Sequence, residues 1–261
     1  MDSLRGVGVM YQYGDPDMLA WQAAKYDMLA NYYKYLNPQK HVHYYHMHLQ
    51  CMQQWLMSER SDQGMGMTGS PAKVRVLHAS PDAPAVDVYV NGQKVLENVS
   101  YKQQSDYLEV PEGQYTIDIY PAGTTNQPVL SQNVGVEGGN MYTVAAAGKL
   151  NNLQLIAVMD NNAVSNGKAK VRFWHLSPNA PAVDIAVKGG DVLFRNIPFG
   201  KATRYLTLPP STVDLEVRVA GTNQAALEVP GVTVSPNQVY TAAALGLAGG
   251  QPPLEAMFLQ P

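Results

Sequence analysis

The chain contains a tandem repeat. Residues 72–90 read AKVRVLHASPDAPAVDVYV, and residues 169–187 read AKVRFWHLSPNAPAVDIAV. Thirteen of these 19 positions are identical at a constant offset of 97 residues. Similarity at one fixed interval predicts that a structural module of roughly 90 residues occurs twice. The repeat therefore sets the domain organisation before any single helix or strand is assigned.

The remaining sequence divides around the two copies. Good helix formers follow Pro16, and Asn37-Pro38 interrupts that pattern because proline lacks the N–H that a helix interior needs. A second helical stretch over about 39–57 completes a predicted αα-hairpin. The expected organisation is a helical hairpin over 1–60, a Gly- and Ser-rich linker over 61–71, a first module over 72–160, a second linker over 161–167 and a second module over 168–261.

Within each module the pattern is that of β-strands. Polar and apolar residues alternate over 115–120 and over 213–219, which is typical of half-buried strands. Asn91-Gly92 directly after 86–90 predicts a β-hairpin turn. Seven or eight short strands per module, with turns every 8–12 residues, predict a mainly β protein. We expect two tandem antiparallel β-sandwich modules of the immunoglobulin-like kind, preceded by an αα-hairpin.

Composition excludes several classes of partner. The net charge is −3 and the 18 Lys and Arg residues are scattered, so no nucleic-acid partner is expected. No run of 18 apolar residues occurs, which predicts no membrane span. The sole cysteine, Cys51, allows no intrachain disulfide. The first ten residues lack the long apolar stretch of a signal peptide, so export by the ordinary route is not expected.

The most similar part of the two copies is the motif His-x-Ser-Pro-(Asp/Asn)-Ala-Pro-Ala-Val-Asp. Histidine and carboxylates are ordinary metal ligands, but Asp82 of the first copy corresponds to Asn179 of the second, which removes a charge. Two prolines three residues apart favour an extended, kinked crossing between strands. We therefore interpret the motif as a structural corner, formed by His78, Ser80, Pro81 and Asp87 and by their counterparts His175, Ser177, Pro178 and Asp184.

The motif also carries a family resemblance. The stretch HASPDAPAVDVYVNG over 78–92 resembles the opening of the family called "domain of unknown function 4397". The segments 115–117 and 141–144 are similar to its later strands, and 240–242 repeats the latter in the second copy. The resemblance implies tandem immunoglobulin-like modules in a bacterial, often surface-attached protein. It implies no catalytic residues, because the family has none assigned.

Histidine is concentrated in the predicted second helix. Four of the six histidines lie within 41–48, and His43 and His46 share one helical face, with Cys51 one to two turns further on. These two imidazoles are the candidate ligands for a divalent metal ion. The alternative is a helix whose histidines are partly exposed and bind no metal. The HExxH spacing of zinc hydrolases is absent.

The N-terminal segment is also rich in aromatic residues, since half of the 16 tyrosines lie in the first 45 residues. Tyr, Trp and Met are favoured at the centres of protein interfaces. We therefore expect protein partners or self-association through the hairpin, with the interface residues Trp21, Tyr32, Tyr33, Tyr44, Tyr45 and Trp55.

These features predict a non-enzymatic structural or adhesive protein of the bacterial envelope or spore surface, with β-sandwich modules displayed by a helical assembly element. A spore-coat or cell-surface location is favoured, with a cytoplasmic one as the alternative. A second hypothesis is carbohydrate binding through exposed aromatic residues such as Tyr101, Tyr107 and Trp174. The pattern around Trp174 fits a core position at least as well. A third hypothesis is metal binding by the histidine cluster. No nucleophile elbow, P-loop or GxGxxG motif indicates an enzyme, and no cofactor is expected.

Overall fold

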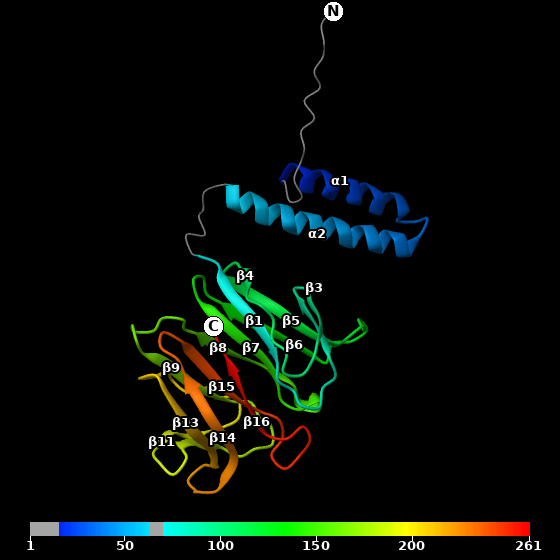
Figure 1. The fold of residues 1–261 in the computed structure, drawn as a ribbon. Coiled ribbons are helices and arrows are strands. Elements are labelled where there is room, and N and C mark those ends of the chain that lie inside the picture. The colour runs from blue at the N-terminus through cyan, green and yellow to red at the C-terminus, as the bar shows by residue number, and fades with distance from the viewer. Residues whose placement is uncertain (1–15, 63–69) are drawn as a thin grey trace, which may run out of the picture. The chain divides into compact units, whose positions relative to one another are not determined.

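A computed structural model of the chain describes residues 16–62 and 70–261, which fall into two compact units (Figure 1). One unit lies within residues 1–69 and contains the helices, and the other spans 70–261 and contains both sequence repeats. The first ten residues, which bear on the signal-peptide expectation, and most of the linker expected over 61–71 lie outside the described residues.

The helical unit is the predicted αα-hairpin. Helix α1 (Pro16–Tyr33) is followed by a short turn and helix α2 (Pro38–Asp62), which runs five residues beyond the expected end at Met57. Asn37 caps α2, because its side-chain oxygen accepts a hydrogen bond from the Lys40 backbone N–H at 3.1 Å. Pro38 occupies the first helical position, where its missing N–H costs nothing.

The two helices pack through a narrow stripe of side chains. Leu19, Ala23 and Ala30 of α1 are buried, and Cys51 is buried on α2. His41 and His48 also lie on the inner side of α2, where each donates a ring N–H to a backbone carbonyl of α1. Spacings of three and four residues on both helices are those of packed helix pairs.

Each repeat forms a sandwich of two four-stranded sheets. The first module contains β1 (Ala72–His78), β2 (Val86–Val90), β3 (Gln93–Val99), β4 (Leu108–Val110), β5 (Gly113–Pro121), β6 (Leu130–Val136), β7 (Met141–Ala147), the short 3-10 helix η1 (Leu150–Asn152) and β8 (Gln154–Asp160). Its sheets have the strand orders β4-β1-β7-β8 and β3-β2-β5-β6. All neighbouring strands are antiparallel except β1 and β7, which are parallel.

The second module repeats this topology. It contains β9 (Ala169–His175), β10 (Val183–Val187), β11 (Val192–Ile197), β12 (Leu206–Leu208), β13 (Ser211–Val219), β14 (Ala225–Val234), β15 (Val239–Leu245) and β16 (Glu255–Leu259). The sheets are β12-β9-β15-β16 and β11-β10-β13-β14. The predicted fold class is therefore confirmed, with mainly β modules in tandem after a helical hairpin.

The predicted hairpin turn and proline corner also occur in the structure. Asn91 and Gly92, with φ of 50° and 79°, form the two-residue connection between β2 and β3. Left-handed backbone at both positions is what a type I′ turn requires, and Asn-Gly supplies it at low cost. The proline-containing segment 79–85 leads from β1 in one sheet to β2 in the other. The segment 176–182 does the same in the second module.

The two sandwiches share an apolar core. One cluster of buried residues lies inside the first module and includes Val76 and Val144, and another lies inside the second and includes Phe173. A third cluster combines residues of both modules, with Leu77, Ala79, Ala145 and Ala147 from the first and Trp174, Leu176, Ala243, Leu245 and Leu259 from the second. The sheets containing β1 and β9 are therefore buried on both faces.

Burial on both faces explains the composition of the central strands. Residues 144–147 of β7 and 242–245 of β15 are continuous apolar runs, in contrast to the alternating pattern of β5 and β13. Continuous runs are typical of strands that are covered on both sides. The many alanines in these runs leave space for Trp174 between the sheets.

No helix among the residues that the structure describes is long and apolar enough to cross a membrane.

The shared core predicts a large effect of one substitution. Trp174→Ala removes a fully buried side chain between the modules and should lower the free energy of unfolding by about 3–5 kcal/mol. The matched control is Phe258→Ala on β16, because the Phe258 side chain is 40% exposed. This variant should lower the free energy of unfolding clearly less than Trp174→Ala does. Chemical denaturation measures both. A Trp174→Ala loss no larger than the Phe258→Ala loss would contradict a shared core.

Candidate functional site

The repeated histidines lie inside their modules. His78 is buried, and its Nε2–H donates to the carbonyl oxygen of Pro84 at 3.0 Å. His175 is buried in the same way and donates to Pro181 at 3.0 Å. Each histidine therefore holds the end of its own proline segment against the strand that precedes it. Burial lowers the pKa of both imidazoles below the usual 6.5.

The Ser-Pro-Asp/Asn part of the motif ties the corner to a neighbouring loop. In the first module the Asp82 carboxylate accepts the backbone N–H of Leu150 at 2.8 Å. In the second, the Asn179 side chain makes two hydrogen bonds to the backbone of Ala248, and Ser177 donates to the carbonyl of Gly246. Aspartate and asparagine can replace each other here because each accepts a backbone N–H through a side-chain oxygen.

The last residue of the motif binds backbone as well. The buried Asp87 carboxylate accepts hydrogen bonds from the Lys94 ammonium at 2.8 Å and from the backbone N–H groups of Asn98 and Gly123. The hydrogen bond from Lys94 and those from the two amides hold the pKa of Asp87 below its usual value.

Asp184 repeats two of these contacts in the second module, with the N–H groups of Asn196 and Gly221. Asn98 and Asn196 both have positive φ, at 53° and 50°, next to irregular strand pairing. The aspartates thus satisfy backbone groups at the bulge and turn beside them.

A buried ionic junction, which the sequence reasoning did not identify, joins the two modules. Asp160, at the end of β8, accepts a hydrogen bond from Arg172 Nη2 of β9 at 2.5 Å. The other carboxylate oxygen accepts the hydroxyls of Tyr107 and Thr143 from the first module. One carboxylate therefore bridges both repeats.

The arginines of the junction are related by the repeat. Arg75 donates to the carbonyl of Gln260 in the second module, and Arg172 donates to the carbonyl of Met159 in the first. Each arginine also donates from Nε to a threonine of its own module. The identical Lys-Val-Arg of the two copies, a charged residue within an apolar strand, was the available sequence signal.

The junction is asymmetric in one respect. Strand pairing places Asp160 opposite Met141. In the second module the pairing of β15 with β16 ends at Thr241 and Leu259, and continuing its register puts Pro261 at the position equivalent to Asp160. Arg172 accordingly has a carboxylate partner, whereas Nη2 of the buried Arg75 has no hydrogen-bond partner within the described part of the chain. Asp160 is the one acidic group of this junction.

The histidine-rich segment does not form a three-ligand cluster. His43 and His46 are exposed, whereas Cys51 is buried against the other helix, with its thiol 3.9 Å from the side-chain oxygen of Gln22. Over residues 16–62 and 70–261, no group of three or more His, Cys, Asp or Glu side chains is placed to hold a metal ion. Cys51 lies one to two turns further along α2, on the side packed against α1, and metal binding by His43 and His46 stays a prediction.

The predicted interface residues divide into two groups. Tyr33 and Tyr44 are half-buried and stack on each other within the hairpin, with ring centroids 5.6 Å apart. Trp55 is also half-buried. Trp21 and Tyr32 of α1, and Tyr45 of α2, are exposed.

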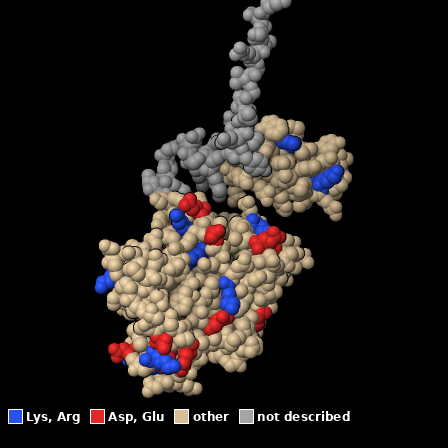
Figure 2. Space-filling view, viewed as in Figure 1, with Lys and Arg blue, Asp and Glu red and all other residues tan. Residues whose placement is uncertain are grey.

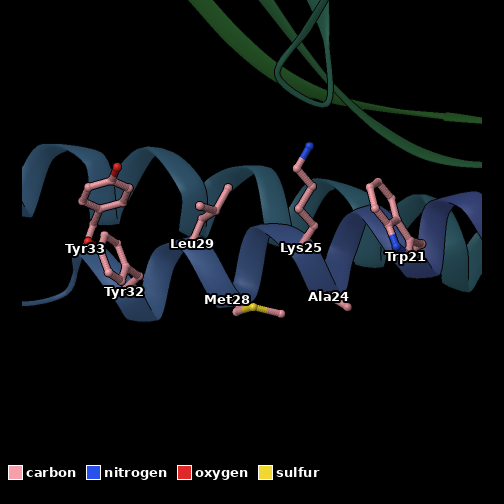
Figure 3. A pocket seen from close by; sticks show the side chains of 7 residues that line it. All are labelled: Trp21, Ala24, Lys25, Met28, Leu29, Tyr32 and Tyr33. Atoms are coloured by element: carbon pink, nitrogen blue, oxygen red, sulfur yellow. The ribbon is translucent and has the colours of Figure 1, made fainter.

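The exposed side of α1 contains a shallow apolar groove of about 700 Å³ (Figure 3). It is lined by Trp21, Ala24, Lys25, Met28, Leu29, Tyr32 and Tyr33. Lys25 is the one charged residue of this lining, and its ammonium lies 5.4 Å from the centre of the Trp21 ring. The groove on α1 is therefore lined mainly by aromatic side chains and by Met28, with Lys25 as its one cation.

The aromatic residues considered for carbohydrate binding are not exposed platforms. Trp174 is fully buried between the modules. Tyr101 is packed against the same core, and Tyr107 is bonded to Asp160 and stacked on Arg75. For Trp174 the core alternative is therefore the correct one. The strand pattern gives the face of a side chain but not whether a second module covers that face.

Surface charge gives no single-sign patch on the face shown in Figure 2, where acidic and basic residues are interspersed in a largely uncharged surface. The exposed ion pairs, such as Lys188 with Glu228, are of the ordinary surface kind. Such pairs contribute little to stability.

Comparison with known proteins gives one family. The family described as "Domain of unknown function (DUF4397)" matches residues 72–186 and 183–260. No curated protein matches the chain.

Two solved structures show remote similarity to the chain. The Bacillus anthracis TIE protein is 12% identical with a TM-score of 0.23, and the alignment covers 69% of this chain and 34% of that one. A DUF3823 family protein from Bacteroides ovatus is 10% identical with a TM-score of 0.20, covering 63% and 98%. The chain thus spans about a third of the length of the TIE protein.

Asp160→Asn tests the junction. The substitution keeps the shape but leaves Arg172 buried without a counter-charge, which should lower the free energy of unfolding by about 3–5 kcal/mol. The control is Glu109→Gln, which breaks the exposed ion pair with Lys73. It should change the free energy of unfolding by no more than about 0.5 kcal/mol. Equal effects of the two variants in urea denaturation would show that the junction does not hold the modules together.

The buried histidines predict a pH dependence. As the pH falls below 6.5, the unfolded chain takes up protons at His78 and His175 that the folded chain does not, so the free energy of unfolding decreases toward acid pH. Each histidine contributes at most about 1.4 kcal/mol per pH unit. The double variant His78→Gln/His175→Gln should show a flatter profile between pH 7 and 5.

The control for this profile is His43→Gln/His46→Gln, which changes residues outside the β unit and should keep the original slope. Denaturation of the β unit, followed by circular dichroism at each pH, gives the comparison. If His78→Gln/His175→Gln does not change the slope of the free energy of unfolding against pH, other groups cause the pH dependence.

Proposed function

The chain belongs to the family described as domain of unknown function DUF4397, and from this premise we propose that it is a non-enzymatic structural or adhesive protein of a bacterial cell or spore surface. The β unit is the displayed body, and the helical hairpin is the element through which the protein assembles. The observation that carries the proposal is the exposed aromatic face of α1, in which Trp21, Met28 and Tyr32 are 63%, 72% and 64% exposed.

The placement of the repeated polar residues supports a structural role for the β unit. His78 and His175 bind the carbonyls of their own corners, and Asp87 and Asp184 bind backbone N–H groups at bulges and turns. These side chains are buried, so the motif that is most alike in the two copies contributes to folding. The histidine and aspartate side chains of the motif use their hydrogen-bonding groups for contacts within their own module.

The construction of the β unit also suits a protein that bears load or displays a surface. Two sandwiches joined by a common core and by the Asp160 junction form one compact body and not two modules on a flexible tether. A rigid body keeps a fixed geometry between its two ends. Large exposed aromatic patches on soluble proteins mark interaction sites, and the α1 face has this character.

The location is tested by labelling intact cells and spores of the source bacterium with antibodies against the β unit. We expect labelling of intact cells or spores, with no requirement for lysis. The control is a cytoplasmic protein labelled in parallel, which should become accessible only after lysis. Labelling of the β unit confined to lysed cells would contradict a surface role.

A further inference from the structure

Helix α1 has two sides that follow the same spacing. The inner side consists of Leu19, Ala23, Tyr26, Ala30 and Tyr33, at intervals of four, three, four and three residues, and faces α2. The outer stripe consists of Trp21, Lys25, Met28 and Tyr32, at intervals of four, three and four. The outer stripe is shifted by two residues from the inner side, which corresponds to a rotation of about 200° around the helix axis. The outer stripe therefore lies on the side of α1 that faces away from α2.

The outer stripe has the properties of a helix-packing surface. Spacings of three and four residues keep the side chains in one row, and a row of this kind packs into the row of another helix. The inner side shows that α1 already packs in this way within the hairpin. The outer stripe is apolar apart from Lys25 and is unpartnered within the described residues. Together with Ala24, Leu29 and Tyr33 on its flanks, it lines the groove seen in Figure 3.

The exposed area is sufficient for a specific pair. Trp and Tyr each contribute about 150–250 Å² when buried. Trp21 and Tyr32 on the outer stripe, and Tyr35 in the turn that follows α1, are all more than 60% exposed. Together with Met28 they offer on the order of 500–600 Å² per copy, or about 1,000–1,200 Å² for a pair of copies. This value meets the minimum of about 1,000 Å² expected of a biological interface.

We propose that the outer stripe of α1 binds the same stripe of a second copy of this chain, with the two α1 helices antiparallel around a twofold axis at Met28. This inference rests on the proposed function and deepens it, because it names the partner of the assembly element. A twofold contact requires a self-complementary surface. In this register Trp21 of each copy lies opposite the turn that follows the other α1 helix, which contains Tyr35.

The single cation fits this arrangement. In the antiparallel register, Lys25 of each copy lies beside Tyr32 of the other, where the ammonium can interact with the ring face as it does with the Trp21 ring of its own chain. The two Lys25 residues are about 9 Å apart along the helix axes, from six residues at 1.5 Å each, so their repulsion is weak in salt. A parallel pair would place the two lysines opposite each other.

Cysteine cross-linking in the full chain tests the register. Helix axes 8–10 Å apart leave about 3.4–5.4 Å between facing Cα atoms, which overlaps the range for a disulfide. In a Cys51→Ala background, Met28→Cys should form a covalent dimer under mild oxidation. The control is Leu49→Cys on α2, which is 46% exposed and should give at least tenfold less dimer. Cross-linking of Leu49→Cys equal to that of Met28→Cys, or none at Met28→Cys, would overturn the proposal.

Sedimentation of the full chain provides the second readout. The unsubstituted protein should be a dimer at micromolar concentration, and Met28→Glu should weaken dimerisation at least tenfold because it buries two like charges on the axis. Leu49→Glu should leave the dimer unchanged. A strict monomer, or a dimer that Met28→Glu does not weaken, would overturn the interface.

These outcomes separate the interface from the proposed function. Surface labelling that persists in a Met28→Glu variant that no longer dimerises supports the location and assigns only assembly to α1. A stable Met28-dependent dimer in a protein that is labelled only after lysis would overturn the location and leave the interface in place.

Discussion

The apolar contact between the two β modules is the interaction on which the rest of the structure depends. The sheet that contains β1 and the sheet that contains β9 each cover the core of their own module with one face and the other module with the opposite face. Exposing the shared cluster to water would leave Trp174 and the apolar runs of β7 and β15 uncovered. Burial of apolar area is the main favourable term in folding, so each module is stabilised by the presence of the other. Each copy of the repeat thus covers one sheet of the other, and Asp160 adds a buried ion pair between the two modules.

Much of this architecture follows from the repeat and from residue patterns. The Asn91-Gly92 turn, the strands with alternating residues and the interruption of the helices at Pro38 all correspond to features of the structure. Each of these features is determined by residues that are close in the sequence, so the sequence alone is enough to predict it. The extension of α2 beyond Met57 was not expected, because the polar residues 58–62 fit a helix end and a linker equally well.

Contacts between the modules were harder to predict. Trp174 alternates with its strand neighbours in a way that fits both an exposed platform and a core residue, and only the second module decides between them. The bridge between Asp160 and Arg172 joins the end of one copy to the start of the next, so comparison of the copies does not show it. The continuous apolar runs of β7 and β15 were the signal that both faces are covered. In the hairpin, spacing alone did not show which of Tyr32, Tyr33 and Tyr44 face inward.

The function proposed here follows from the difference between the two units. The β unit uses its repeated polar residues to hold corners and bulges, whereas the hairpin leaves aromatic side chains exposed on α1. The central claim is that the two modules are one body. Hydrogen exchange under conditions in which every opening leads to exchange tests it most directly. The account predicts that the amides of β7 and β15 become exchangeable together, in one opening event. Exchange of one module while the other stays protected would contradict it.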